Sequence, residues 1–317
     1  MCGWKKHEWR LVTVNKDRRF FLKDTEFQES IEQVITLISE VDNEIFSRYV
    51  EVTRHIMELN KLFYVFRYNL KNLLDHFMLN TNDLIESKDA QLSDDEYYYQ
   101  INALTINFIS SAKTLTDSIE VCMKSFLSAA DFSSFKEKVI SKQYDDKFSY
   151  RFLIHMRHYA QHGHLPINIH EQKAYFDLDE ILSMPHFDLN RKLKNEIDEL
   201  KADIYNQFGN MPYISYVFTI AEFNLIITEI YFKFLNEVKP ILVELNNKKN
   251  QILNEHPEYR FVNPDGSINA MIFYYNDGES FRCFNGNDNS IEMYASMKRE
   301  VKKILKNETH QYNKLRI

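Results

Sequence analysis

The chain has 317 residues, which is enough to bury a sizeable core without disulfides or metal ions. It contains only six Gly and six Pro, and this scarcity disfavours sandwiches, barrels and Gly-rich nucleotide folds, which need such residues at their turns. The net charge of −7 argues against nonspecific coating of DNA but leaves room for one local basic site. Composition therefore predicts a mainly helical protein.

Features of cellular location are also visible in the sequence. Cys2, Cys122 and Cys283 lie far apart and form no CxxC pair, which is typical of thiols in a reducing compartment. The opening MCGWKKHEWR lacks the apolar core of a secretion signal. The most apolar stretch, Tyr213 to Leu235, is interrupted by polar and charged side chains, so we expect a buried helix there and no membrane span. We expect a cytoplasmic protein.

Residues 1–24 alternate aromatic, basic and β-branched side chains, which indicates an extended arm or hairpin. Thr25 with Gln28 resembles a capping box and predicts a helix reaching about Ile45. A second helical pattern covers residues 48–79 and ends in a polar loop.

The clearest helix of the sequence is expected to begin at Ser93, which forms a capping box with Glu96. One apolar stripe continues along it over seven turns: Ile101, Leu104, Phe108, Ala112, Leu115, Ile119, Cys122 and Phe126. Shorter helices are predicted over 134–145 and 150–162, the second of them closed by Gly163.

The following segment, 164–188, is expected to be a long irregular connection of the kind that often carries function. Helical patterns resume over 189–205 and 213–253, with a kink expected at Pro240. Asp-Gly pairs at 265–266 and 277–278 then predict hairpin turns, and a basic amphipathic helix covers about 290–306. The predicted division of the chain is 1–92, 93–256 and 257–317.

Reactive side chains are concentrated in residues 151–170. Five of the eleven histidines of the chain fall there: His155, His158, His162, His164 and His170. Between Lys136 and Lys173, seven Lys or Arg face four Asp or Glu, so this part of an acidic protein is locally basic. A cationic, histidine-rich cleft suits a phosphodiester substrate.

Within this cluster, RHYAQH from Arg157 to His162 resembles the Arg-x4-6-His motif of the HEPN superfamily, helical bundles of which many are metal-independent ribonucleases. The resemblance covers about residues 93–255. It implies an all-α fold, a HEPN-like helical bundle that would carry an N-terminal helical extension and a small C-terminal β-hairpin plus helix appendage. It further implies a homodimeric endoribonuclease that acts on RNA as a toxin or defence effector, with an antitoxin or regulatory protein as a further partner and no cofactor.

Metal-free cleavage of RNA uses the substrate 2′-hydroxyl as nucleophile and leaves a cyclic phosphate and a 5′-hydroxyl. Arginine offers a permanently charged planar fork to phosphate oxygens, and histidine exchanges protons near neutral pH. We therefore expect Arg157 to stabilise the phosphorane and His162 to exchange protons. The expected supporting residues are His158, Gln161 and Asp117, although Asp117 also fits a solvated helix face. The expected RNA contacts are Lys147, Arg151, Tyr159 and His164.

The spacing of the motif constrains its geometry. Five residues along a helix turn the direction of a side chain by roughly 500°, so Arg157 and His162 lie roughly 140° apart around the axis. A site composed of two subunits at a two-fold axis would bring the two groups to one phosphate.

Two other interpretations remain open at this stage. His155, His158 and His162 share one helix face with spacing seen in zinc helices, but no Glu lies between them as in HExxH. A catalytically silent helical module that binds a protein or a nucleic acid would also fit the sequence. Cleavage of RNA in the presence of a chelator distinguishes all three.

Overall fold

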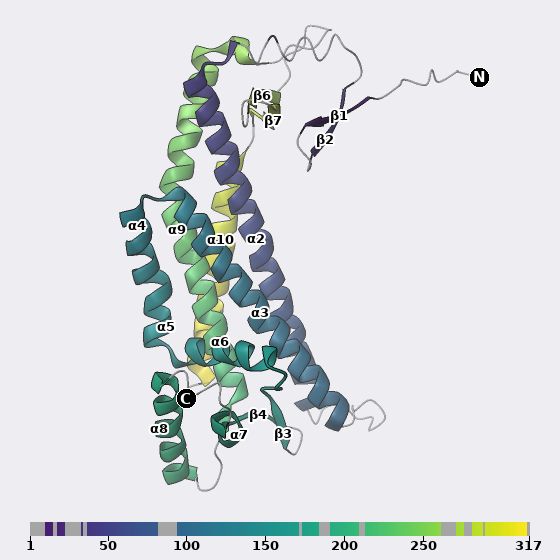
Figure 1. Cartoon of the computed structure of the whole chain (residues 1–317), viewed down its shortest axis with the longest axis vertical. Coiled ribbons are helices and arrows are strands. Elements are labelled where there is room, and N and C mark those ends of the chain that lie inside the picture. The colour runs from purple at the N-terminus through teal and green to yellow at the C-terminus, as the bar shows by residue number, and fades with distance from the viewer. Residues whose placement is uncertain are drawn as a thin grey trace, which may run out of the picture. The chain divides into compact units, whose positions relative to one another are not determined.

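The chain is mostly helical in the computed structural model, and its strands form only small antiparallel sheets (Figure 1). The structure describes residues 10–14, 18–22, 33, 37–81, 94–170, 173–183, 191–208, 213–260, 271–275, 281–287 and 289–315. The mainly helical character that composition predicts is therefore observed. Across these ranges, no helix is both long enough and apolar enough to cross a membrane.

Two compact units make up the chain. The first comprises Met1–Met57 and Glu237–Ser296, and the second comprises Glu58–Asn236 and Met297–Ile317. The boundaries fall within three long helices: α2 (Glu40–Thr81), α9 (Tyr216–Glu255) and α10 (Ser290–Leu315). The three-part division made from the sequence stays a prediction.

In the first unit, α2 begins directly after Ser39, whose Oγ accepts a hydrogen bond from the backbone N–H of Asp42 at 3.1 Å. The predicted break between Ile45 and Arg48 is wrong, because α2 continues through it. No Gly or Pro interrupts the segment, and the buried side chains of Phe46 and Tyr49 continue one apolar stripe. The predicted capping box at 25–28 lies outside the described residues.

Both predicted hairpins of the first unit are confirmed. β1 (Arg10–Val14) pairs with β2 (Arg18–Leu22), and β6 (Met271–Tyr275) pairs with β7 (Phe281–Asn285), each antiparallel. The Asn43 side chain holds β6 on α2 because its Nδ2 donates to the Tyr275 carbonyl and its Oδ1 accepts from the Tyr275 N–H, both at 2.7 Å. A short 3-10 turn (Pro257–Tyr259) follows α9, and the expected turn at 265–266 lies in the part not described.

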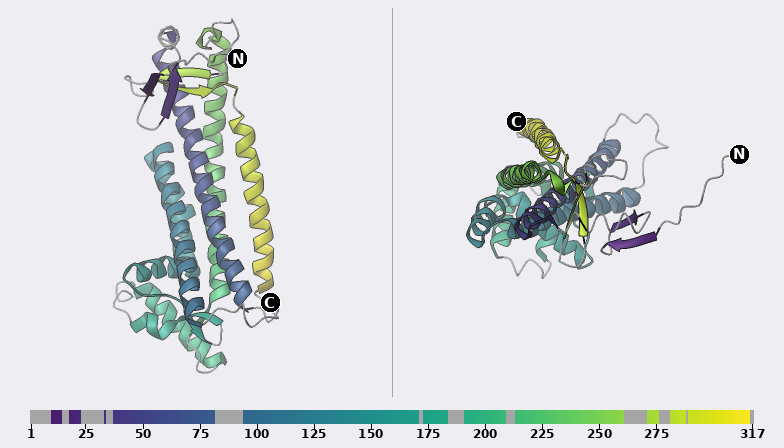
Figure 2. Two further views of the ribbon diagram at one scale, coloured as in Figure 1. Left: turned by 90° about the vertical axis from the view of Figure 1, so that its right-hand side faces the viewer. Right: turned by 90° about the horizontal axis from the view of Figure 1, so that it is seen from above.

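The second unit has an aromatic core where α2, α3 (Asp94–Phe126) and α9 pack together (Figure 2). Phe108 of α3 lies 5.2 Å from Phe66 of α2 and 5.6 Å from Phe223 of α9, measured between ring centroids. Phe63 stacks on Tyr231 at 4.4 Å. The predicted stripe of α3 is the face that contributes to this core, although the expected cap Ser93 falls outside the described ranges.

A bent helical arm connects α3 to the histidine-rich segment. It consists of α4 (Ala129–Phe135), a π-helical turn (Lys136–Ser141) and α5 (Lys142–Asp146). The arm begins earlier than the predicted residue 134, because Ser128 caps it by accepting a hydrogen bond from the Asp131 N–H at 3.2 Å. α6 (Phe148–Gln161) follows and confirms the helix predicted over 150–162.

The connection after α6 is more regular than predicted. β3 (Asn168–His170), β4 (Lys173–Asp177) and β5 (Tyr213–Ser215) form an antiparallel sheet in the order β3-β4-β5. Two helices lie between β4 and β5 in the chain, α7 (Leu178–Ser183) and α8 (Arg191–Phe208). β3 and β5 have three residues each, which is too short to show the alternation of apolar and polar side chains that predicts a strand. β5 also delays the start of α9, which then continues past Pro240 without a break.

Candidate functional site

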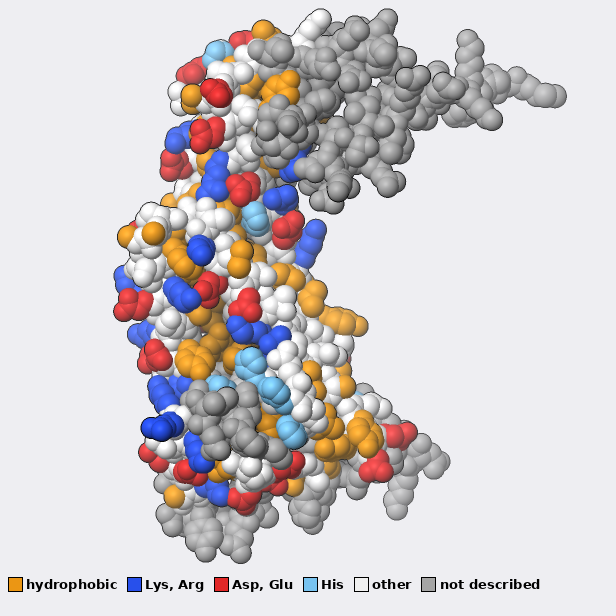
Figure 3. Space-filling model, viewed as in Figure 1, with side chains coloured by type: hydrophobic (Ala, Val, Ile, Leu, Met, Phe, Trp, Pro, Cys, Tyr) orange, Lys and Arg blue, Asp and Glu red, His pale blue; other side chains and the backbone are white. Residues whose placement is uncertain are grey.

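The RHYAQH segment occupies the last turns of α6, and Figure 3 shows histidine side chains gathered over this helix. The opposite face of α6 is buried: Phe152 and Met156 are fully enclosed, and Phe152 packs edge-on against Phe176 of β4 at 4.9 Å. His158 is half-buried, whereas Gln161 and His162 are exposed. The polar motif residues of the helix therefore lie at its surface side, and its apolar face packs against the core and fixes the position of the helix.

A Schellman motif ends α6 at the motif histidine. The N–H of His164 donates to the Tyr159 carbonyl at 3.4 Å, and the N–H of Gly163 donates to the Ala160 carbonyl at 3.1 Å. Gly163 has φ +89°, which a residue with a Cβ adopts only under strain, so the predicted glycine stop is confirmed. His162 is the C-cap, and its imidazole lies at the exposed end of the helix.

The chain immediately beyond the motif is anchored to α3 by one buried amide. Asn102 Nδ2 donates to the Ile167 carbonyl at 2.8 Å, and Asn102 Oδ1 accepts from the Ile167 N–H at 2.9 Å. The Asn102 side chain thus imitates one rung of a β-ladder while only 1% exposed. Because Ile167 is five residues after His162, this pair fixes where the end of α6 lies on α3. The sequence shows Asn102 only as a polar residue beside the apolar stripe.

Arg157 differs from a typical structural arginine. It is half-buried, and its Nε is enclosed without a hydrogen-bond partner in the described part of the chain. No carboxylate of that part forms an ion pair with it. A guanidinium withdrawn from water normally gains a carboxylate, a carbonyl or a bound anion, since an unpaired buried donor costs about 1–3 kcal/mol.

Arg151, predicted to contact RNA, is instead a structural residue. It is 3% exposed and lies six residues before Arg157 on the same helix. Its Nε donates to Glu196 of α8 at 3.0 Å, a second nitrogen pairs with the other carboxylate oxygen, and the third nitrogen donates to the carbonyls of Tyr144 and Asp145. These bonds use four of the five N–H donors of the guanidinium and connect α6 to α5 and α8, so the almost fully buried Arg151 offers little to a phosphate.

Tyr159, predicted to stack on a base, is a core residue that is 1% exposed. Burial, with smaller contributions from Glu180, Tyr98 and Asp177, raises the pKa of Tyr159 to about 12, so its phenol stays protonated. The His164 ring lies 4.9 Å from the Tyr159 ring and completes the helix cap with a side-chain contact. Both residues therefore shape the end of α6, and Tyr159 has almost no exposed surface on which a base could stack.

Two further predicted residues lie away from the motif. Asp117 is exposed and forms an ion pair with Lys113 on its own helix. Its charge acts on Tyr150, which precedes His162 by twelve residues, or about 18 Å of helix. Lys147 is exposed at the N-cap of α6, about 22 Å from the His162 end. The structure therefore places Arg157, His158, Gln161 and His162 on the last turns of α6 and its C-cap, and leaves Asp117 and Lys147 toward the opposite end of the helix.

The alternative metal site on α6 does not form in this arrangement. The His155 and His158 rings are 6.3 Å apart, and the Tyr144 hydroxyl lies 3.2 Å from His155 Nε2. Within the described ranges, no three His, Cys, Asp or Glu side chains are grouped closely enough to hold a metal ion.

No protein-family model, curated protein or solved structure matches the chain. Its candidate function therefore depends on its own residues, and the resemblance to HEPN proteins stays a prediction.

Proposed function

We propose that the chain is a metal-independent endoribonuclease of the HEPN type. Arg157 stabilises the charge of the phosphorane, and His162 exchanges protons with the reacting oxygens. His158 and Gln161 assist from the neighbouring turn. The 2′-hydroxyl of the substrate attacks the adjacent phosphorus, and the products carry a cyclic phosphate and a 5′-hydroxyl. The expected biological role is that of a toxin or defence effector that a regulatory protein restrains.

The observation that carries this proposal is the contrast between two arginines of one helix. Arg151 has four of its five N–H donors bonded to a carboxylate and to backbone carbonyls, whereas Arg157 has an enclosed Nε without a partner among the described residues and forms no ion pair with their carboxylates. A phosphate that bound the guanidinium of Arg157 would neutralise its charge. The exposed imidazole of His162 follows five residues later on the same helix. A cation and a proton carrier are the two groups that metal-free RNA cleavage needs.

The functional unit is proposed to be a homodimer. Along α6, Arg157 and His162 differ by roughly 140° in direction, so one copy presents them to different sides of the helix. Two copies related by a two-fold axis place the arginine of one beside the histidine of the other. Each dimer then holds two equivalent sites.

The first test is incubation of the full chain with a structured RNA in excess chelator. Arg157→Ala and His162→Ala should each lower cleavage by about 10²-fold or more, which is the usual contribution of such groups. Lys302→Ala is the control, since it removes an exposed cation of α10 from the same unit. Intact RNA with the wild-type chain under varied conditions would favour the silent interaction module. Cleavage that requires added Zn²⁺ or Mn²⁺ would contradict the proposed chemistry.

Mixing the two inactive variants tests the shared site. In a one-to-one mixture half of the dimers are mixed, and each mixed dimer has one site with both Arg157 and His162 intact. Activity should therefore return to about a quarter of the wild-type value if subunits exchange freely. A mixture as inactive as its components would contradict a site built from the arginine of one copy and the histidine of the other.

A further inference from the structure

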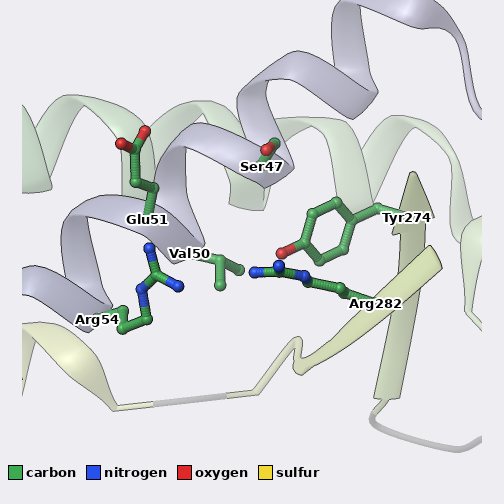
Figure 4. Close-up of a pocket in the computed structure, with 6 residues that line it drawn as sticks. All are labelled: Ser47, Val50, Glu51, Arg54, Tyr274 and Arg282. Carbon is green, nitrogen blue, oxygen red and sulfur yellow. The ribbon is translucent and has the colours of Figure 1, made fainter. Parts of the chain in front are cut away.

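A second cationic site belongs to the first unit, whereas the RHYAQH motif belongs to the second. A pocket of about 270 Å³ opens between α2 and the β6–β7 hairpin. Its lining residues are Ser47, Val50, Glu51, Arg54, Tyr274 and Arg282 (Figure 4). Arg54 reaches the pocket from α2 and Arg282 from β7, and the Tyr274 hydroxyl points into the same space. All six residues belong to the first unit.

The two arginines of this pocket have no acidic partner among the residues that the structure describes. Arg54 is half-buried, and its Nε is enclosed without a hydrogen bond. Arg282 is also half-buried and takes part in no ion pair within the same ranges. Glu51 is the acidic residue of the lining, but it is held by Arg48 at 2.9 Å, and Figure 4 shows its carboxylate pointing away from both guanidinium groups.

The charges of the pocket therefore favour an anion. Arg54 and Arg282 contribute two positive charges, while Glu51 and Arg48 cancel each other, which leaves +2 in a chain whose net charge is −7. Two like charges that share a half-buried pocket repel each other, and a bound dianion removes this repulsion. Each planar guanidinium group can donate two hydrogen bonds to phosphate oxygens. The two groups therefore match a phosphate better than they match a spherical anion.

The size of the pocket indicates more than a bare ion. An engineered cavity of about 150 Å³ holds one benzene molecule, so the 270 Å³ of this pocket accommodate a phosphate group together with a small organic group. The hydroxyls of Ser47 and Tyr274 add donors of the kind that phosphate oxygens accept. We propose that this pocket binds the phosphate group of a small phosphomonoester. This proposal is independent of the ribonuclease activity.

Isothermal titration calorimetry of the full chain in a phosphate-free buffer tests the proposal with two probes. Inorganic phosphate reports on the phosphate subsite alone, and phenyl phosphate adds a small organic group. Tighter binding of phenyl phosphate identifies an ester as the ligand, whereas equal affinity identifies free phosphate. If neither probe binds with a Kd of about 10 mM or tighter, the proposal is wrong.

Variants connect the binding to the pocket. Arg54→Gln and Arg282→Gln should each weaken binding by about tenfold or more, because each removes charge-assisted hydrogen bonds to the dianion. Lys248→Gln is the control, as it removes one exposed cation from the same unit. Affinity unchanged in both arginine variants would place the bound phosphate elsewhere and overturn the proposal.

Glu51→Gln provides a test with the opposite sign. It removes the acidic charge of the lining, so binding of either probe should become several-fold tighter. A fold damaged by substitution would weaken binding and could not produce this gain. Unchanged or weaker affinity in a folded Glu51→Gln chain, checked by circular dichroism, would contradict a site governed by the charge of this pocket.

Discussion

Arg151→Met separates the structural arginine of α6 from the functional one. The Arg151 side chain is 4% exposed, and the Glu196 side chain is 25% exposed. Removing one partner of a buried ion pair costs about 3–5 kcal/mol. Because water reaches part of Glu196 and screens its charge, we expect the lower end, about 3 kcal/mol of unfolding free energy. The carbonyls of Tyr144 and Asp145 lose their donor as well.

This loss is measurable by thermal unfolding followed by circular dichroism. For a unit of about 200 residues, each kcal/mol shifts Tm by about 2–4 °C, so Arg151→Met should lower Tm by about 6–12 °C. A double-mutant cycle with Glu196→Gln isolates the pairwise interaction, which we expect to be about 2 kcal/mol. A Tm within about 1 °C of the wild type would refute the reasoning, because the loss of a buried ion pair must lower the Tm by more than this.

Arg157→Met is the matched comparison on the same helix. It removes a guanidinium whose Nε has no partner among the described residues, so the free energy of unfolding should not fall and should rise by about 1 kcal/mol as the unpaired donor is lost. The proposed function requires this variant to be inactive on RNA. Arg151→Met should thus lower the stability of the chain, whereas Arg157→Met should leave the chain stable but unable to cleave RNA. Equal losses of stability would show that Arg157 is structural.

Burial lowers the pKa of His76 in the folded chain, so the unfolded chain binds a proton more readily. Protonation of His76 in the unfolded chain therefore lowers the free energy of unfolding as the pH falls below about 6.5. His76→Phe should therefore lose less Tm than the wild type between about pH 7 and pH 5, and parallel Tm curves would contradict this. Arg67 pairs with Glu308 of α10 at 2.5 Å and donates to Asn224 of α9 at 2.9 Å. Arg67→Met should speed amide exchange in the second-unit part of α10 by about tenfold. Lys71→Met, which breaks an exposed pair, should leave that exchange unchanged, and equal effects of both variants would refute a specific anchoring role.

Local signals account for what the sequence predicted correctly around the site. Gly163 after the last polar residue of RHYAQH indicated a helix end, and the structure has a Schellman motif there. The motif requires only backbone bonds within six residues, so neighbouring residue types carry the information. The same reasoning applies to the Asp-Gly pair at 277–278, which lies between β6 and β7.

The sequence does not show which side chains distant partners bury or bond. Arg151 looked like one cation of a basic segment, but its burial depends on Glu196, 45 residues later, and on where α8 lies. Tyr159 is 1% exposed, and the groups whose charges raise its pKa come from β4, α7 and the start of α3, which are separate from α6 in the chain. Arg54 and Arg282 share a pocket although 228 positions separate them. A periodic pattern shows that a helix has an apolar face, but it does not show which polar residues lie at its edge.

Under the proposed function, the amide of Asn102 makes activity at RHYAQH depend on a residue 55 positions before Arg157. An aspartate at this position would keep the acceptor but lose the donor to the Ile167 carbonyl, and a chain with that change would retain every letter of the motif. In natural variants of this protein, an intact Arg157 and His162 would therefore be insufficient evidence of an active enzyme unless residue 102 still carried a carboxamide.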